Sequence, residues 1–310
     1  MTDEGLPVWQ RPGSASAIYA KFAGSRSLRD QWVQMVRASW GNPDHPELCL
    51  FQDVTREDGV VRGPAGRAVP VTVMRPPGRV RDAFLYLHGG GWVAPLSGKH
   101  VAWAKRLASL TGQEIHCVEY GLAPEKPFPQ GLEDCLVCYN ALRSRCDGQV
   151  SVGGDSSGGN LALALALYCA DHGVRRPDRI AALSPATDMH FEDYPAFERL
   201  GRGNPIADPS VLAFQRACYL SRADWQNPYA SPMLGRLEAL PLLFILAGGQ
   251  DPLHEENLVF ARKCEAAGVP TTVYYQPDLP HAFHTHHDVL PAEADAANAA
   301  IAAFLGTPAG

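Results

Sequence analysis

The sequence predicts an α/β fold with a mostly parallel central sheet covered by helices on both faces. From about residue 51 onward, short apolar runs alternate with longer runs of helical spacing. The short runs lack polar alternation, which is typical of parallel strands buried on both faces. A length of 310 residues with 46% hydrophobic composition is enough to build a large core, and no internal repeat or low-complexity linker interrupts it.

Changes in hydrophobic spacing, together with glycine and proline, set the element boundaries. Val69–Met74 is short and β-branched, and Pro76-Pro77-Gly78 ends it. Ala83–Leu87 is wholly apolar and runs into a glycine-rich turn. Further strands are expected at 115–119, 150–154, 180–183, 242–246 and 272–275. The accompanying helices are expected near 100–110, 132–143, 161–170, 255–267 and 292–305.

Two segments depart from this alternation. Residues 1–50 contain apolar side chains at helical spacing between 16 and 39 and no opening strand, which predicts an appended helical segment. Residues 188–225 also lack a clear strand and carry a helical run at 209–220, so they form either a lid or an ordinary pair of surface helices. The catalytic core is therefore expected to comprise 51–187 and 226–310.

Composition excludes several classes of protein. The formal net charge of -6 and the scattered basic residues give no reason to expect a nucleic-acid or anionic-membrane partner. The N-terminus lacks the pattern of a secretory signal, and the longest apolar run, 161–170, is too short to span a bilayer, so we expect a cytoplasmic protein. Eight cysteines in such a chain predict free thiols, and the Cys135-x-x-Cys138 pair is expected in the core.

The segment Gly154-Asp155-Ser156-Ser157-Gly158 fits the pattern G-x-S-x-G between a predicted strand and a predicted helix. A sharp turn at this place strains the serine backbone and lifts the hydroxyl above the sheet edge. Glycine is needed on each side because a side chain there would collide across the turn. Ser156 is therefore the candidate nucleophile. Centring the motif on Ser157 would instead put Asp155 where a glycine belongs.

A second glycine-rich segment, His88-Gly89-Gly90-Gly91-Trp92, follows the strand at 83–87. Its unshielded backbone N–H groups suit the stabilisation of a developing oxyanion, and the N–H of Ser157 adds a further donor. Neither G-x-G-x-x-G nor G-x-x-x-x-G-K-[ST] is present, which disfavours a phosphate-binding loop. Gly89, Gly90, Gly91 and Ser157 are the candidate oxyanion donors, with the choice among the glycines open. His88 is expected to shape the loop.

A serine nucleophile needs a base, and the base needs an acid to orient it. Asp251 follows the strand at 242–246, and His281 follows the last strand. The chain order Ser156, Asp251, His281 is the one expected for this kind of hydrolase, and all three residues follow strands at the edge where open α/β sheets bind ligands.

Alternative assignments exist for the acid and for the histidines. Asp188 and Asp278 also lie near strand ends, and the cluster at 284–287 raises a metal site as an alternative. That cluster has no carboxylates at a recognised spacing, and the segment beginning at His254 fails H-E-x-x-H because Leu258 stands at the last position. We therefore expect neither a metal nor a cofactor.

Taken together, these residues resemble the hormone-sensitive-lipase family of esterases (bacterial family IV), which has the α/β-hydrolase fold. The resemblance extends from about residue 80 onward and carries the following motifs: 88–92, Tyr120–Glu125, Phe128-Pro129, 154–158, Ser184-Pro185, 251–253 and His281. It implies that 1–50 and 188–225 form a helical cap over the acyl site. Three positions depart from the family pattern: Gly121 replaces arginine, Ser157 replaces alanine and Ala282 replaces glycine.

The sequence thus predicts a serine hydrolase that cleaves esters with short or medium acyl groups through an acyl-enzyme. Its partner would be a small acyl substrate, with a homodimer as a possible assembly. One alternative is a dedicated deacylase or amidase of a specialised metabolite. Another is a non-catalytic receptor on the same scaffold, although such receptors lose the catalytic histidine and His281 is present.

Overall fold

The computed structural model describes residues 30–31, 33–34, 36–38, 45–78, 80–201 and 208–306. Most of the expected N-terminal helix, 16–39, lies outside these residues, although those described between 30 and 38 are helical. The strands are β1 (Thr55–Arg62), β2 (Ala68–Arg75), β3 (Ala83–Leu87), β4 (Glu114–Val118), β5 (Val150–Asp155), β6 (Arg179–Leu183), β7 (Leu242–Gly248) and β8 (Thr271–Gln276). The helices are α3 (Gly98–Thr111), α4 (Gln130–Arg145), α5 (Ser157–Asp171), α6 (Pro195–Gly201), α7 (Pro209–Tyr219), α8 (His254–Ala266) and α9 (Pro291–Gly306).

All eight strands form one sheet in the order β1-β2-β4-β3-β5-β6-β7-β8. The two pairings β1–β2 and β2–β4 are antiparallel, whereas every pairing from β4 through β3 to β8 is parallel. The sheet is thus mostly parallel, as predicted. Its inner strands β3, β5 and β6 are buried along their full length, which explains their continuous apolar sequences.

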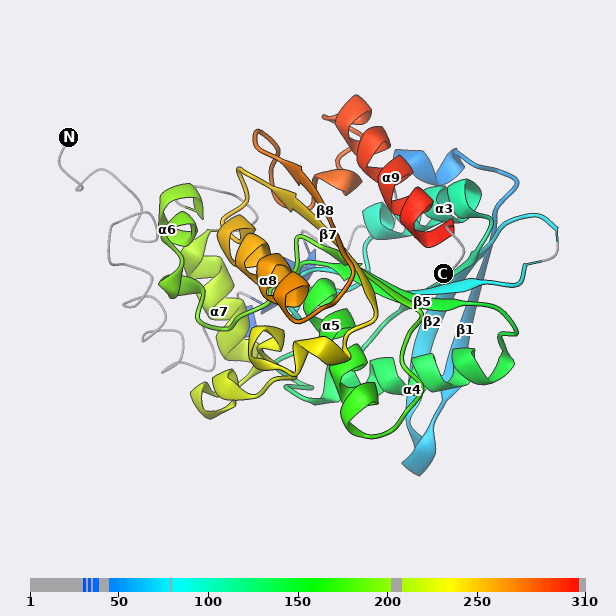
Figure 1. Ribbon diagram of the computed structural model, residues 1–310. Coiled ribbons are helices and arrows are strands. Elements are labelled where there is room, and N and C mark those ends of the chain that lie inside the picture. The colour runs from blue at the N-terminus through cyan, green and yellow to red at the C-terminus, as the bar shows by residue number, and fades with distance from the viewer. Residues whose placement is uncertain are drawn as a thin grey trace.

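Helices cover both faces of the sheet (Figure 1). α3 and α9 pack together on one face, and α4, α5 and α8 lie on the other. α5 is buried almost throughout because helices and sheet surround it, which explains its nearly continuous leucine and alanine sequence. Two hydrophobic clusters, one for each face, form the core.

The segment between β6 and β7 contains α6, α7 and short 3-10 turns and adds no strand to the sheet. Figure 1 shows α6 and α7 beside the sheet, away from the layer formed by α3 and α9. α7 begins after Asp208, whose side chain caps the N–H of Ser210. No helix in the described ranges is long and apolar enough to span a lipid bilayer.

Two elements, β1 and α6, carry no clear signal in the sequence. The sequence of β1 contains only two consecutive valines, Val60 and Val61, among polar residues, and most of the strand is exposed. It forms by backbone pairing with β2, so its side chains need not be apolar. The short helix α6 lies within the 188–225 segment, where the sequence predicted a helix only at 209–220.

All eight cysteines lie in the described part of the chain and are free thiols. Cys135 and Cys138 are buried on α4, as predicted, and burial raises the pKa of the Cys138 thiol to about 12.

Candidate active site

The turn between β5 and α5 holds Ser156 in a strained conformation. Its backbone has φ 54° and ψ -119°, values that non-glycine residues rarely adopt and that cost about 1–3 kcal/mol. The Ser156 N–H donates to the carbonyl of Leu183 on the neighbouring strand β6 at 2.9 Å. A Cβ added to Gly154 or Gly158 would overlap the Leu87 carbonyl, so the flanking glycines allow β3 to approach the turn. This is the geometry that the G-x-S-x-G pattern predicts.

The loops after β7 and β8 meet and bring Asp251 to His281. The Gly249 N–H donates to the Gln276 carbonyl at 2.7 Å, and the Gln250 N–H donates to the Leu279 carbonyl at 3.0 Å. Across this junction, His281 Nδ1 lies 2.8 Å from Asp251 Oδ2. Two residues 30 positions apart are therefore joined by a hydrogen bond at the predicted sheet edge.

Asp251 is fully buried, and its second oxygen, Oδ1, accepts the N–H of Leu253 at 2.9 Å. Burial by itself lowers the pKa of His281, but the charge of Asp251 and the hydrogen bond to it raise the pKa more, so it ends above its ordinary value. The charge of Asp155, next to Ser156, also raises the pKa of His281. The arrangement gives a histidine whose protonated form is stabilised by a fixed carboxylate.

The two rival aspartates are placed differently. Asp188 Oδ1 contacts His190 Nδ1 at 2.9 Å, and its Oδ2 accepts the Tyr194 hydroxyl at 3.0 Å, so this carboxylate organises the segment that contains α6. Asp278 is exposed. Neither hydrogen-bonds to His281 within the described residues.

Asp155 ties the glycine-rich loop after β3 to the serine turn. Its Oδ1 accepts the Gly89 N–H at 3.0 Å and the Tyr86 hydroxyl at 2.5 Å. Burial alone raises the pKa of Asp155, but the charge of His100 and hydrogen bonds from His100 and Tyr86 lower it below its ordinary value. Because its N–H is engaged by this carboxylate, Gly89 is not free to bind an oxyanion in this arrangement.

Gly90 and Gly91 have positive φ values of 118° and 60°, which favour glycine. The Gly90 carbonyl accepts the N–H groups of Val93 and Ala94 at 3.2 and 3.0 Å and so closes the loop. Ser157, the first residue of α5, is buried, and a first-turn N–H has no partner within its own helix. Of the four predicted donors, Gly90, Gly91 and Ser157 thus remain candidates.

His88 is buried beneath the loop. Its Nδ1 lies 2.8 Å from the Gly89 carbonyl, and its ring stacks on Tyr120 with centroids 4.4 Å apart. The Tyr120 hydroxyl donates to the His88 carbonyl at 2.7 Å. Burial lowers the pKa of His88 to about 3, which keeps the ring neutral at neutral pH. These contacts fit the loop-shaping role that the sequence suggested.

The departures from the family pattern have local explanations. Gly121, which stands where arginine is usual, donates its N–H to Asp134 at 2.8 Å, and Arg67 supplies the cation to that aspartate at 2.6 Å. Arg67 follows β1 and is far from Gly121 in the sequence. Ala282 has a φ of 51°, which explains why glycine is usual there, and its N–H donates to Ser184 Oγ at 3.1 Å.

The N-terminal segment also reaches the glycine-rich loop. Arg37 donates to the carbonyls of Val93 and Ala123 at 2.9 and 3.0 Å, and it pairs with Glu125 at 2.8 Å. Val33 is buried in the larger hydrophobic cluster. The described part of this segment is therefore fixed to the end of the loop.

The histidines at 284–287 have separate surroundings. His284 is fully buried with its ring edge-on to Trp103, and burial lowers its pKa to about 3. His287 Nε2 contacts Asp295 at 3.3 Å and the Asn298 amide at 3.1 Å. Among the residues that the structure describes, no group of three or more histidine, cysteine or acidic side chains is arranged to hold a metal ion.

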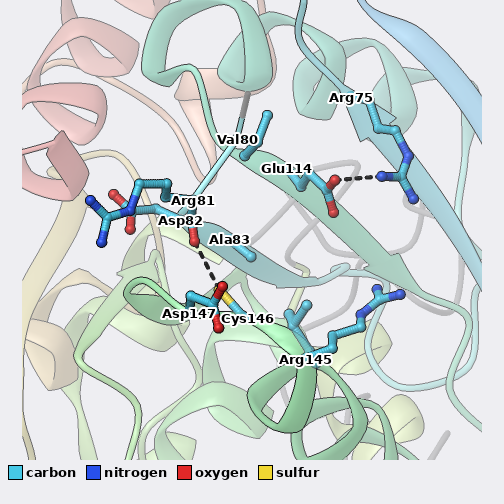
Figure 2. A pocket seen from close by; sticks show the side chains of 10 residues that line it. Arg75, Val80, Arg81, Asp82, Ala83, Glu114, Arg145, Cys146 and Asp147 are labelled. Carbon is cyan, nitrogen blue, oxygen red and sulfur yellow. Dashed lines mark hydrogen bonds and ion pairs between the residues drawn. The ribbon is translucent and has the colours of Figure 1, made fainter. Parts of the chain in front are cut away.

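A separate cavity of about 410 Å³ lies at the opposite edge of the sheet, where β3 and β4 begin. Arg75 pairs with Glu114 at 2.5 Å, and Cys146 Sγ contacts the Arg81 carbonyl at 3.1 Å. Figure 2 shows the guanidinium groups of Arg81 and Arg145 pointing away from each other. Arg81 and Arg145 therefore do not converge on a common ligand, and Arg75 is already paired with Glu114.

The strained serine, the Asp251–His281 pair and the glycine-rich loop lie on one mostly parallel sheet, and the family model for the alpha/beta hydrolase fold matches residues 84–285. The chain belongs to this α/β-hydrolase family. It is 33% identical to an acetyl-hydrolase of Streptomyces hygroscopicus over 241 residues, which cover 76% of this chain and 79% of the relative.

Other relatives show which α/β-hydrolases this chain resembles. The chain is 37% identical to the hormone-sensitive lipase of Mus musculus over 141 residues, covering 44% of this chain and 18% of that much longer protein. A hyperthermophilic esterase from the archaeon Pyrobaculum calidifontis has a similar structure, with a TM-score of 0.77, 28% identity and coverage of 91% of this chain and 97% of the other. The predicted resemblance to hormone-sensitive-lipase-type esterases is confirmed, and the protein is a carboxylesterase-type hydrolase.

Several residues of this region were not singled out from the sequence. Asp155 occupies the variable second position of G-x-S-x-G, where the pattern gives no hint of a role. Ser184 and Tyr120 were noted only as parts of a resemblance. Gln215, on α7, lies against Gly91, and no sequence motif marks it.

Proposed function

We propose that this enzyme cleaves carboxylic esters of short or medium acyl chains through an acyl-enzyme on Ser156. The observation that carries the proposal is the buried 2.8 Å contact between His281 and Asp251. It lies at the edge of the sheet where β5 ends and the strained Ser156 follows. In the Ser-His-Asp mechanism, His281 takes the serine proton while Asp251 orients and stabilises the imidazolium. The protonated histidine then gives its proton to the leaving alcohol, and water completes the cycle.

The oxyanion is held by backbone N–H groups of Gly90, Gly91 and Ser157. Losing one such donor typically raises the barrier by about 3 kcal/mol, so the loop contributes to catalysis as much as a side chain does. Asp155 acts as a positioning residue because it fixes the Gly89 N–H and with it the start of the loop.

The residues around the site support a cap, formed by the N-terminal segment and by 188–225. Arg37 joins the first of these to the loop after β3, and α7 of the second lies against Gly91. A short acyl preference is supported by the similarity to the Streptomyces acetyl-hydrolase. A non-catalytic receptor role is disfavoured because His281 and its partner carboxylate are both in place.

The test is hydrolysis of p-nitrophenyl esters across acyl lengths by the wild-type enzyme and by Ser156→Ala. We expect the variant to lose a factor on the order of 10⁴ or more in kcat, since the nucleophile is removed. Ser151→Ala is a matched control because Ser151 is a buried serine on β5, the strand that leads to the turn at Ser156. Full activity in Ser156→Ala would refute the proposed nucleophile, and an inactive folded wild type would refute simple ester hydrolysis.

A further inference from the structure

The Gln215 side chain lies directly over the glycine-rich loop. A Cβ added to Gly91 would overlap the Gln215 carboxamide, so the amide occupies the space above the Gly91 backbone. Gln215 as a whole residue is 6% exposed. Gly91 carries one of the N–H groups assigned above to the oxyanion, so the amide lies beside the place where the scissile carbonyl binds.

Neighbouring contacts fix the position of Gln215. Arg216 donates to the Met189 carbonyl, pairs with Glu192 at 2.6 Å and stacks 3.8 Å from the Trp225 ring centroid. Tyr219, one turn further along α7, stacks on Trp92 with ring centroids 4.5 Å apart. Because both flanks of this helical turn are anchored, the Gln215 backbone is held beside the loop.

Among the described residues, none hydrogen-bonds to this amide, and its polar atoms are not fully shielded from solvent, so its two donor hydrogens and its acceptor oxygen stay accessible. Leucine or methionine would fill similar space with an apolar surface, whereas glutamine presents hydrogen-bonding groups beside the loop. These groups are therefore available to a molecule that enters this place, and in the proposed reaction that molecule is the substrate.

We propose that Gln215 determines specificity by hydrogen-bonding an oxygen-bearing substituent of the substrate close to the scissile carbonyl. With the carbonyl oxygen on Gly90 and Gly91, a hydroxyl or carbonyl oxygen within about three or four bonds of the carbonyl carbon reaches hydrogen-bond distance of an amide over Gly91. The preferred esters are thus oxygenated near the reacting bond, on the acyl or the alcohol side. This inference rests on the proposed ester hydrolysis at Ser156.

Two matched pairs of esters test the proposal and separate the two sides. The acyl pair is p-nitrophenyl 3-hydroxybutyrate and p-nitrophenyl butyrate, and the alcohol pair is 2-hydroxyethyl butyrate and propyl butyrate. For each pair, the ratio of kcat/KM for the hydroxylated ester over the plain ester is measured in wild type and in Gln215→Leu. Comparing the ratio between the two enzymes cancels the intrinsic reactivity of the esters.

We expect the ratio to fall at least tenfold in Gln215→Leu for one of the two pairs, because a site built to pair a polar group discriminates against substrates that lack it. Gln113→Leu is the matched control: Gln113 is an equally buried glutamine, and its amide instead donates to the Leu305 carbonyl at 3.2 Å. This control is expected to keep the wild-type ratio. Gln215→Met, which fills the space with an unbranched side chain, serves if the leucine variant does not fold.

Ratios that agree within twofold between wild type and the Gln215 variants, for both pairs, would overturn the proposal and leave Gln215 as a packing residue. The failure of the proposed function gives a different result. In that case wild type hydrolyses none of the four esters, or Ser156→Ala hydrolyses them as fast as wild type, and the specificity proposal falls with it.

Discussion

At the scale of single residues, the pairing of His281 with Asp251 would set the pH dependence of the proposed reaction. A general base must be neutral, and Asp251 raises the pKa of His281 above its ordinary value of 6.5. As the pH is lowered, half of the His281 side chains are therefore already protonated at a pH above 6.5. A fully buried carboxylate that accepts one imidazole and one backbone N–H has little freedom to move.

We predict that Asp251→Asn lowers kcat by a factor on the order of 10³–10⁴, because the fixed tautomer and the stabilising charge are both lost. The acid limb of kcat/KM should lie above pH 6.5 in the wild type. In the variant it should move to lower pH, since the charge that raised the histidine pKa has been removed. Rate profiles from pH 5 to 9 check both points, and an unchanged limb would show that Asp251 does not control the titrating group.

The contact between Gly89 and Asp155 distinguishes the three glycines of the loop. Three consecutive glycines are equivalent donors in the sequence, but the Asp155 carboxylate binds the first of them. The proposed oxyanion donors are therefore Gly90, Gly91 and Ser157, the first residue of the next helix, and no longer include Gly89.

At the scale of elements, the strand-to-helix turn depends on close contact between backbones. β3 and β5 are parallel neighbours, and the start of α5 passes next to the Leu87 carbonyl at the end of β3. Gly158 therefore serves packing, whereas Gly90 and Gly91 serve backbone conformation.

We predict that Gly158→Ala destabilises the protein by about 1–3 kcal/mol, because the added methyl group would overlap the Leu87 carbonyl and force β3 and α5 apart. Gly59→Ala is the control: its Cβ would lie 3.9 Å from the nearest atom, a Val71 methyl group, in the exposed strand β1. That change should alter the free energy of unfolding by at most about 0.5–1 kcal/mol. Urea unfolding curves measure both, and equal stabilities for the two variants would contradict the packing argument.

At the scale of the whole molecule, buried histidines make the fold sensitive to acid. His88 and His284 are almost completely buried, and burial lowers the pKa of each to about 3. In the unfolded chain each takes up a proton near pH 6.5, so between about pH 6 and 3 the unfolded state binds more protons than the folded state. Stability must then fall as the pH falls through this window.

The raised pKa of His281 acts in the opposite direction. Its contribution to stability is fully present below pH 6.5 and is lost as the pH rises through its folded pKa. We predict a net loss of stability between pH 7 and pH 5, since each buried neutral histidine contributes a slope approaching about 1.4 kcal/mol per pH unit below its unfolded pKa. Urea unfolding at several pH values measures this slope, which His284→Phe should reduce. A slope unchanged in that variant would show that His284 is not the group responsible.

The sequence by itself determined the fold class and most of the candidate active-site residues. Alternating apolar strands and helices predicted the parallel core, because strands buried on both faces must be apolar throughout. Patterns around Ser156, His88 and His281 predicted the candidate residues of the active site, because a strained turn and a close approach of two backbones restrict which residues fit. β1 escaped detection because an exposed strand that pairs through its backbone needs no apolar pattern.

Tertiary structure alone decided which of the candidates meet. The contact of His281 with Asp251 rather than Asp188 or Asp278 results from the loops after β7 and β8 packing on each other. The engagement of Gly89 by Asp155 and the place of Gln215 over Gly91 likewise join segments far apart in the chain. Local patterns report backbone conformation and burial, whereas pairings between distant residues depend on how whole elements pack, and no short stretch of sequence records that.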